Sequence, residues 1–390
     1  LTKIIYDGTP GGMPGWGAAG IYTKEQAELL ARYIQQEPVA PPEFNMKDIR
    51  ATWKLHIPPE KRPAQPMHRR NLENFFAVIL RDAGQIAIID GDTKEIVSIQ
   101  NTGFAVHTLR YSHSGRYLYT IGRDGKATMI DLWMDPITTV AEIKTALDAR
   151  SIESSKYKGP KGDFLDKFVI VGNYWPPAYV ILNGQTLEPL KIVSTRGYTY
   201  DTNEYHQEPR VASIVASHQD PEWVVNVKET GHVLLVDYSD IKNLKVTSIE
   251  SERFLHDGGW DASKRYFLVA ANMRDKMVVV DTKTKKLAAI VETGVKPHPG
   301  RGANFVDPKY GPVYATPHIG EAAVALIGTD PEGKYKEYAW KVVRKLKVAG
   351  DGGLFIKTHP NSKNLWVDHT LSNDINAARS VTVYDKTNLD

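Results

Sequence analysis

The sequence predicts an all-β protein, a β-propeller built from four-stranded blades. Three observations lead to this fold class. From about residue 70, apolar and polar residues alternate along short segments. Most of these segments end in Asp or Asn followed by a polar turn, and the unit repeats seven times at an average spacing of about 49 residues, close to the length of one blade. Because seven copies exceed what one β-sandwich holds, the repeat favours a propeller over a sandwich.

The seven repeats share an apolar strand that ends in one turn residue. These turn residues are Asp90, Asp131, Asn183, Asp237, Asp281, Gly328 and Asp385. A hairpin of two apolar strands joined by Ser, Asp or Gly precedes several of them, as in HTLRYSHSGRYLYTIGRDG and FIKTHPNSKNLWVD. The chain ends at Asp390 on the strand of the last repeat, so we expect at least one blade of the ring to be missing.

The first 37 residues follow a different pattern. A Gly- and Pro-rich opening leads to Thr23, whose hydroxyl can cap a helix while Gln26 reaches back in a capping box. Apolar residues then recur at helical spacing up to Pro38, namely Ala27, Leu30, Tyr33 and Ile34. Two Pro-rich runs predict an extended linker. We therefore expect a helical part at 1–37, a linker at 38–66 and the propeller at 67–390.

Composition excludes several classes of function. The 49 Lys and Arg nearly balance the 46 Asp and Glu, so the chain has no overall basic field of the kind that nucleic-acid binding requires. No stretch approaches about 18 uninterrupted apolar residues, so we expect no membrane span. Because cysteine is absent, a thiolate nucleophile, a cysteine zinc site, a disulfide and covalent haem attachment through CxxCH are excluded within this chain.

Three of the twelve histidines stand in distinctive surroundings. His107 lies between an apolar strand and an arginine, His256 lies in FLHDGGWD, and His298 lies in KPHPGRGANF, where Pro and Gly force a tight backbone. Each opens a repeat, so three blades can direct these imidazoles towards the propeller axis. A surface or hydrogen-bonded imidazole is the ordinary alternative for each one taken alone.

Four arginines follow similar strand ends. They are Arg81, Arg110, Arg123 and Arg301, and two of them stand three residues after one of the three histidines. Guanidinium groups pair with carboxylates through two parallel hydrogen bonds, so such a cluster can receive a ligand that carries several carboxylates. Surface salt bridges are the alternative interpretation.

Six long motifs extend over nearly the whole chain. They are FAVHTLRYSHSGRYLYTIGRDGK, STRGYTYDTNEYHQEPRVASIVASH, VNVKETGHVLLVDY, FLHDGGWD, KPHPGRGANFVDPKYGPVYATPHIGE and FIKTHPNSKNLWVD. In these motifs the sequence closely resembles the d1-haem domain of cytochrome cd1 nitrite reductase. GMPGWG and the helix after it resemble the C-terminal end of the cytochrome c domain of that family.

The resemblance implies an eight-bladed propeller, its last blade absent from this chain, that holds haem d1 in its channel. It implies that His107 is the proximal ligand of the haem d1 iron and that His256 and His298 form the distal catalytic pair. The residues implied to bind the haem carboxylates and line the pocket are Arg81, Arg110, Arg123, Tyr174 and Arg301. Met13 would be the axial ligand of haem c in the longer parent protein.

The resemblance also implies an activity, the one-electron reduction of nitrite to nitric oxide and water. Imidazoles that titrate near neutral pH suit it, because they can donate protons and stabilise an anion. It further implies a periplasmic homodimer that receives electrons from a small c-type cytochrome or a cupredoxin. Two alternatives stay open: a d1-haem biosynthesis or carrier protein, and a cofactor-free propeller that binds other proteins.

Overall fold

The structure is a computed structural model that describes residues 1–9, 13–36 and 42–389. These residues form two compact units, Leu1–Glu43 and Phe44–Asp390. Each unit has a hydrophobic core of its own.

The first unit contains two helices, α1 (Thr2–Asp7) and α2 (Lys24–Tyr33). The predicted capping box is confirmed at the start of α2. The backbone N–H of Gln26 donates to the Thr23 hydroxyl at 3.2 Å, and the backbone N–H of Thr23 donates to the Gln26 side chain at 2.8 Å. Two N–H groups that helix geometry leaves without a partner are satisfied in this way.

The buried face of α2 is narrower than the spacing of apolar residues predicts. Ala27 and Ala31 pack with Ile5 of α1, whereas Tyr33 is 71% exposed and Ile34 is 53% exposed. The helix itself ends at Tyr33, as the spacing predicts, and its apolar spacing continues beyond the part that this unit buries. With only six residues, α1 is about 9 Å long and covers only part of α2.

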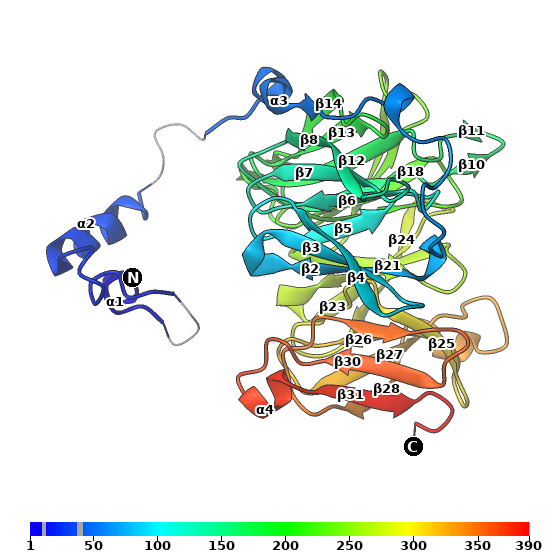
Figure 1. Cartoon of the computed structure of the whole chain (residues 1–390). Helices are drawn as coiled ribbons and strands as arrows, with labels where there is room; N and C mark the ends of the chain where they lie inside the picture. The colour runs from blue at the N-terminus through cyan, green and yellow to red at the C-terminus, as the bar shows by residue number, and fades with distance from the viewer. Residues whose placement is uncertain (10–12, 37–41, 390) are drawn as a thin grey trace. The chain divides into compact units, whose positions relative to one another are not determined.

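Seven β-sheets follow one another along the second unit (Figure 1). In chain order they are β2 (Phe75–Leu80), β3 (Gln85–Asp90) and β4 (Glu95–Asn101); β5 (Thr108–Tyr111), β6 (Tyr117–Ile121), β7 (Lys126–Asp131) and β8 (Thr138–Lys144); β9 (Asp148–Ser154), β12 (Phe168–Trp175), β13 (Ala178–Asn183) and β14 (Pro189–Ser194); β17 (Val211–Ala216), β18 (Glu222–Val227), β19 (His232–Asp237) and β20 (Lys245–Glu250); β21 (Leu255–Trp260), β22 (Tyr266–Ala271), β23 (Lys276–Asp281) and β24 (Lys286–Glu292); β25 (Ala303–Asp307), β26 (Gly311–Pro317), β27 (Ala323–Gly328) and β28 (Val342–Lys347); and β29 (Ile356–Thr358), β30 (Asn364–Asp368) and β31 (Val381–Asp385).

Shorter elements lie before and between the sheets. They are α3 (Met46–Thr52), β1 (Lys54–Leu55), the hairpins β10 (Lys158–Gly159) with β11 (Gly162–Asp163) and β15 (Gly197–Tyr198) with β16 (Tyr205–His206), α4 (Ile375–Ala378), and the 3₁₀ helices η1 (Pro59–Lys61), η2 (Leu72–Asn74), η3 (Arg81–Ala83), η4 (Asn272–Arg274) and η5 (Lys336–Tyr338). None of the described helices is long and apolar enough to cross a membrane.

The seven predicted turn residues each end a strand. Six of them end the third strand of their sheet, and Asp90 ends β3, the second of the three strands of the first sheet. Asp281 shows why an acidic residue recurs there. Its carboxylate accepts the backbone N–H of Lys283 at 3.0 Å, which fixes the turn, and pairs with the guanidinium of Arg265 at 2.7 Å.

Alternation along the strands produces a core between every two consecutive sheets. Buried apolar side chains form one cluster between the first and second sheets and further clusters for each following pair up to the sixth and seventh. Because successive side chains of a strand point to opposite faces, one sheet contributes to the core on both of its sides. This arrangement of face-to-face blades is that of the predicted propeller.

The segment predicted as the end of a linker packs against the propeller. Ile49 of α3 is fully buried in the core between the second and third sheets. Lys54 and Leu55 form β1, which adds a fifth strand to the second sheet by pairing with β8. The indole N–H of Trp53 donates to the carbonyl of Thr186 at 2.8 Å. Residues 44–66 therefore belong to the second unit, because their apolar side chains find a partner surface that proline content does not reveal.

The described residues contain seven blades, not the eight implied by the family resemblance. The first and seventh sheets have three strands each, and no core cluster of the described residues joins them. Their outer faces expose apolar side chains instead. Phe76 and Ile96 of the first sheet are 58% and 60% exposed, and Trp366 and Val383 of the seventh are 46% and 43% exposed.

Candidate functional site

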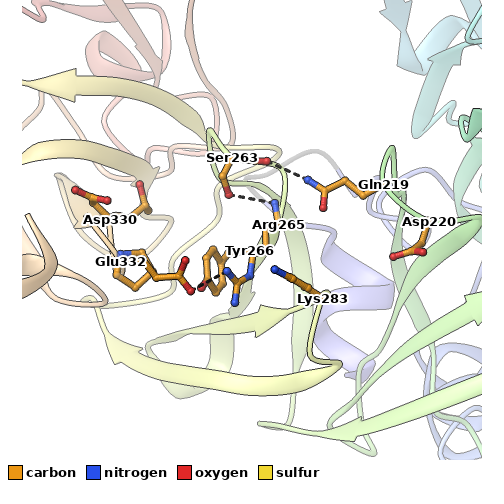
Figure 2. A pocket seen from close by; sticks show the side chains of 10 residues that line it. Gln219, Asp220, Ser263, Arg265, Tyr266, Lys283, Asp330 and Glu332 are labelled. Carbon is orange, nitrogen blue, oxygen red and sulfur yellow. Dashed lines mark hydrogen bonds and ion pairs between the residues drawn. The ribbon is translucent and has the colours of Figure 1, made fainter. Parts of the chain in front are cut away.

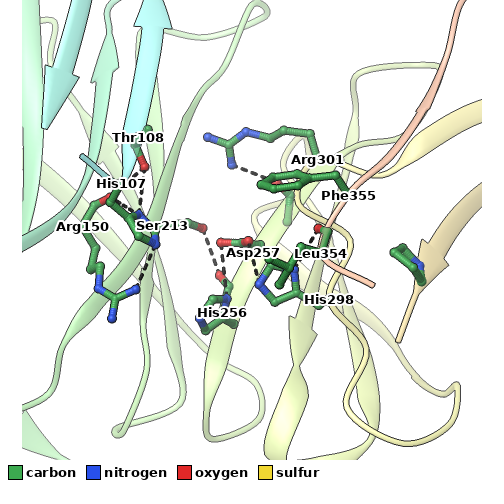
Figure 3. Close-up of polar contacts among 12 residues, drawn as sticks. His107, Thr108, Arg150, Ser213, His256, Asp257, His298, Arg301, Leu354 and Phe355 are labelled. Atoms are coloured by element: carbon green, nitrogen blue, oxygen red, sulfur yellow. Dashed lines mark hydrogen bonds and ion pairs between the residues drawn. The ribbon is translucent and has the colours of Figure 1, made fainter. Parts of the chain in front are cut away.

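The starts of the innermost strands bring residues from several blades together. His107 precedes β5, Arg150 lies near the start of β9, His256 lies in β21, and His298 precedes β25. The innermost strands of a propeller run in the same direction around the axis, so their starts meet at one end of the channel. Figure 3 shows these side chains converging, as the sequence predicts for the three histidines.

Both ring nitrogens of His107 are held by one neighbouring residue. Nδ1 of His107 donates to the carbonyl oxygen of Arg150 at 2.9 Å, and Nη1 of Arg150 donates to Nε2 of His107 at 2.9 Å. Nε2 must accept this bond, so it carries a lone pair and the proton resides on Nδ1. Burial and the charge of Arg150 lower the pKa of His107 to about 4. His107 is therefore neutral near pH 7, with Nε2 in the form that binds iron.

A carboxylate joins His256 to His298. Asp257 Oδ1 lies 3.3 Å from Nδ1 of His256, and Asp257 Oδ2 lies 3.2 Å from Nε2 of His298. The two imidazole rings are 4.9 Å apart between centroids. Although burial opposes its ionisation, the two imidazoles and Arg301 lower the pKa of Asp257 far below its ordinary value, so this group is a carboxylate.

A β-bulge allows two consecutive residues to reach the same site. The pairing of β21 with β22 shifts register between Leu255 and Gly258, and His256 and Asp257 lie within this shift. In a regular strand their side chains would point to opposite faces, and the bulge removes this constraint. Two donors hold the carbonyl oxygen of His256 in place. It accepts the Ser213 hydroxyl at 2.9 Å and the side-chain amide of Asn226 at 3.2 Å.

Arg301 lies near the histidine pair and acts on the charge of Asp257. Its guanidinium donates to the carbonyl oxygens of Gly258 and Ile214, each at 3.0 Å. Burial lowers the pKa of Arg301 to about 10, so it remains a cation near pH 7. Gly259, the residue after Gly258, permits this approach, because a Cβ atom at that position would collide with the carbonyl oxygen of Arg301.

Tyr174 is buried at the end of β12 and lies between two arginines. The guanidinium groups of Arg150 and Arg210 lie over its ring at 4.9 and 5.1 Å from the centroid. Burial raises the pKa of Tyr174, so its hydroxyl stays protonated. The three residues present two cations and one hydroxyl at the same end of the channel.

The four predicted arginines lie in different surroundings. Arg123 pairs through two hydrogen bonds, at 2.6 and 2.5 Å, with Asp148 at the start of β9. Arg81 is exposed and pairs with its neighbour Asp82 at 2.9 Å. Arg110, midway along β5, lies 3.6 Å from Glu153. Of the four, Arg301 is the one that the structure brings beside the histidine pair.

Met13 belongs to the first unit, where its side chain is 39% exposed. Its backbone N–H donates to the Thr9 hydroxyl at 3.2 Å, and its carbonyl accepts the backbone N–H of Thr9 at 3.0 Å. The loop geometry around Met13 is thus set by Thr9.

Sequence reasoning missed Asp257, Arg150 and Arg210. Asp257 directly follows His256, but strand alternation argues against two neighbours on one site, and only the bulge brings them together. Arg150 and Arg210 stand at the start of β9 and just before β17, the same strand position as the three histidines. This shared strand position is the sequence signal from which Arg150 and Arg210 could have been predicted.

The donor atoms of His256, Asp257 and His298 all lie within 4.8 Å of one another, close enough to surround a metal ion. The two oxygens of Asp257 are, however, each directed at one imidazole. We interpret the three side chains as an ion-paired triad. His107, with its unprotonated Nε2, is the residue suited to ligate a haem iron.

Two cavities lie away from the triad. One of about 520 Å³ is lined by Gln219, Asp220, Ser263, Arg265, Tyr266, Lys283, Thr329, Asp330, Pro331 and Glu332, and its arginine is neutralised by Asp281 and Glu332 (Figure 2). The other, of about 600 Å³, is lined by Leu109, Arg110, Tyr111, Ser112, His113, Lys156, His218 and Lys357. No acidic residue lines the second cavity.

Comparison with known proteins agrees with this geometry. Residues 70–390 match the family model of the cytochrome D1 heme domain. The chain is 55% identical to a nitrite reductase of Stutzerimonas stutzeri over 393 residues, covering 100% of this chain and 69% of that protein. It is 24% identical to a dihydro-heme d1 dehydrogenase of Pseudomonas aeruginosa over 94% of this chain and 69% of that protein. A solved structure of dihydro-heme d1 dehydrogenase NirN in complex with DHE shares the fold, with a TM-score of 0.80 at 24% identity over 100% of this chain and 77% of that one.

Proposed function

Because this chain belongs to the cytochrome D1 heme domain family, we propose that it reduces nitrite at haem d1 by one electron, releasing nitric oxide and water. Identity of 55% to a nitrite reductase along the whole chain supports nitrite as the substrate. The observation that carries the proposal is the meeting of a neutral, ligand-ready His107 with the triad of His256, Asp257 and His298 at one end of the channel.

The residues at this end fit haem d1. His107 offers the lone pair of Nε2 to the iron once Arg150 releases it. Arg150 would supply a guanidinium group for a haem carboxylate, and Tyr174 a flat ring beside it. Arg210 and Arg123 pair with Glu229 and Asp148 and would have to exchange these partners for haem carboxylates. When bound, haem d1 supplies the iron that takes up nitrite and passes it an electron.

The protons come from the protein. Reduction of one nitrite consumes one electron and two protons and gives one nitric oxide and one water, so a donor must stand beside the departing oxygen. His256 and His298 hold protons at ring nitrogens next to each other. The positive charge of Arg301 near them favours the binding of an anion in a pocket that excludes water.

Further features of the family are proposed for the longer protein. An eighth blade would cover the exposed apolar faces of the first and seventh sheets, on which Phe76 and Trp366 lie. The separate first unit is proposed to be the end of a cytochrome c domain, with Met13 as the axial ligand of haem c. The proposal includes a periplasmic homodimer and a small c-type cytochrome or cupredoxin as electron donor.

The test compares three variants of the haem-loaded protein. His298→Ala is expected to lower nitrite turnover by about 10²- to 10⁴-fold, the usual contribution of a positioned proton donor, and to retain the visible spectrum of the bound haem. His107→Ala is expected to change that spectrum, because the iron loses its protein ligand. His359→Ala, on an exposed turn, is the control and should match the parent. Full turnover in His298→Ala would reject the role of the distal pair.

Conversion of a haem d1 precursor is the second candidate. The fold shared with a dihydro-heme d1 dehydrogenase, at a TM-score of 0.80, favours it. A protein with that function would oxidise dihydro-haem d1 and show no nitrite turnover. A cofactor-free binding propeller, the remaining alternative, would show no affinity for haem d1 in a titration followed by absorbance, and nitrite turnover separates the other two.

A further inference from the structure

We propose that Asp257 holds His298 in its doubly protonated form and thereby keeps the proton donor charged between turnovers. This inference deepens the proposed function, because it assigns a positioning residue to the histidine pair. It rests on the oxygen atoms that the two nitrogens of His298 face, one in a hydrogen bond and one in an ion-pair contact.

Both nitrogens of His298 face oxygen atoms that can only accept. Nδ1 lies 3.0 Å from the carbonyl oxygen of Leu354, and Nε2 lies 3.2 Å from Oδ2 of Asp257 (Figure 3). A carbonyl oxygen and a carboxylate oxygen have no hydrogen to donate, so both contacts favour a hydrogen on each nitrogen. This is the arrangement of an imidazolium with Asp257 as its counter-ion. The side chain of His298 is 8% exposed, so water competes little with these partners.

His256 differs from His298 in its contacts. Its Nδ1 lies 3.3 Å from Oδ1 of Asp257 but makes no hydrogen bond, in contrast to Nδ1 of His298, which binds the carbonyl of Leu354. Burial lowers the pKa of His256, and the charge of His298 adds to the effect. The pair thus consists of one charged and one neutral imidazole around one carboxylate. Such an arrangement carries a single excess proton on His298.

The charged groups around the triad come from several elements. Asp257 and His256 lie in β21, His298 and Arg301 lie before β25, and Lys228 follows β18. Arg301 and Lys228 oppose further protonation, whereas Asp257 favours it. Since Asp257 is the carboxylate in contact with both imidazoles, its removal leaves these cations without compensation.

The consequence for turnover concerns reloading. When Nε2 of His298 gives its proton to an oxygen of nitrite, the nitrogen lone pair is left facing Oδ2 of Asp257. Two lone pairs at about 3 Å repel, and a new proton on Nε2 removes the repulsion. Asp257 therefore favours reprotonation of His298 before the next nitrite is reduced.

The test uses nuclear magnetic resonance of protein labelled with ¹⁵N at histidine. In the parent, both nitrogens of His298 are expected to show imidazolium shifts at pH 7.5 or so, a value chosen to lie above the ordinary histidine pKa of about 6.5. His298→Gln identifies the signals by removing them. In Asp257→Asn, one nitrogen is expected to show the shift of a neutral ring, because the amide can donate to Nε2. Asp281→Asn removes a carboxylate at the last residue of β23 and should leave the signals of His298 unchanged.

Kinetics of the haem-loaded variants complete the test. Asp257→Asn is expected to bind haem normally. As pH is raised, its turnover should fall at a lower pH than the turnover of the parent. A neutral His298 in the parent spectrum, or an unshifted pH profile in Asp257→Asn, would overturn the inference. Neither outcome depends on whether His298→Ala is inactive, so the proposed function and this inference fail separately.

A second inference rests on the cavity of about 600 Å³, and we propose that it binds a small oxyanion. Ser112 and His113 follow β5, Lys156 follows β9 and His218 follows β17. These are the ends of the innermost strands, whereas the triad lies at their starts, and Arg301 acts electrostatically on both Asp257 and Lys357.

Positive charge in this cavity exceeds negative charge. Arg110 and Lys156 share Glu153, at 3.6 and 3.1 Å, and no carboxylate of the described residues pairs with Lys357. Burial and the guanidinium groups of Arg301 and Arg110 lower the pKa of Lys357, as expected where cations lack an anion. The cavity in Figure 2 differs, since its arginine is neutralised by two carboxylates.

Inorganic phosphate serves as the probe in a calorimetric titration of the protein. We expect saturable binding that weakens with added salt and weakens at least tenfold in Lys357→Gln. Lys283→Gln, in the other cavity, should bind like the parent, and His298→Ala should too, because the triad lies at the other end. Absence of saturable binding, or unchanged affinity in Lys357→Gln, would overturn the proposal. Loss in His298→Ala would place the anion at the triad instead.

Discussion

Arg150 holds His107 from both sides, through its carbonyl at Nδ1 and its guanidinium at Nε2, each at 2.9 Å. One residue therefore selects the tautomer of the imidazole and covers the nitrogen that a metal would use. The carbonyl contact is built into β9 and persists when the side chain moves, whereas the guanidinium, which also lies over the ring of Tyr174, can leave Nε2. Arg150 thus prepares the ligand and can then contact the haem edge.

Loss of the Arg150 guanidinium should weaken haem binding. Arg150→Gln keeps the backbone carbonyl on His107 but removes a charged hydrogen bond to a haem carboxylate, worth about 1.5 to 3 kcal/mol, or roughly 10- to 100-fold in affinity. Titration of haem d1 into the apoprotein measures this change. Arg32→Gln, an exposed residue of the first unit, is the control. Equal affinity of Arg150→Gln and parent would remove Arg150 from the haem site.

Truncation of Ile49 should destabilise the propeller unit. Its side chain is fully buried between the second and third sheets, so Ile49→Ala is expected to lower the free energy of unfolding by about 2 to 5 kcal/mol. Denaturant unfolding measures the loss. Ile96→Ala, at a position 60% exposed, should change it little. If Ile49→Ala were as mild as the control, the segment would behave as the linker that proline content predicts.

The pair of Asp281 and Arg265 should stabilise the fifth sheet in a pH-dependent way. The guanidinium holds the pKa of Asp281 at about 2, below the ordinary value of about 3.9. A lowered pKa means that the stabilisation is present above pH 4 or so and fades as pH falls towards 2. Asp281→Asn is expected to cost about 1 to 3 kcal/mol near pH 7.

Unfolding by urea at several pH values tests this expectation. The difference between Asp281→Asn and the parent should narrow steadily below about pH 4, because the parent carboxylate then becomes protonated. Asp240→Asn, on an exposed turn, is the comparison. A difference that stays constant down to pH 2 would show that the charge of Asp281 contributes nothing.

Local patterns in the sequence are sufficient for the repeat and its turns. All seven predicted turn residues end a strand, and in six of them an Asp or Asn side chain fixes the turn by accepting the next backbone N–H groups. The capping box of Thr23 and Gln26 is likewise a matter of neighbours in the chain. Strand position also placed His107, His256 and His298 at one end of the channel.

Other features depend on contacts between distant segments. Proline content cannot show that Ile49 finds a core, and helical spacing cannot show that α1 is too short to cover Tyr33. Asp257 joins the histidines only because a bulge in β21 breaks alternation.

The sequence by itself determined the blade repeat, the turn chemistry and the three histidines, because these depend on residues within one hairpin or one strand. The tertiary structure decided which charges meet. Partner choice for Asp257, Arg150 and Glu153 depends on the register and curvature with which separate blades pack, and no local pattern carries that information.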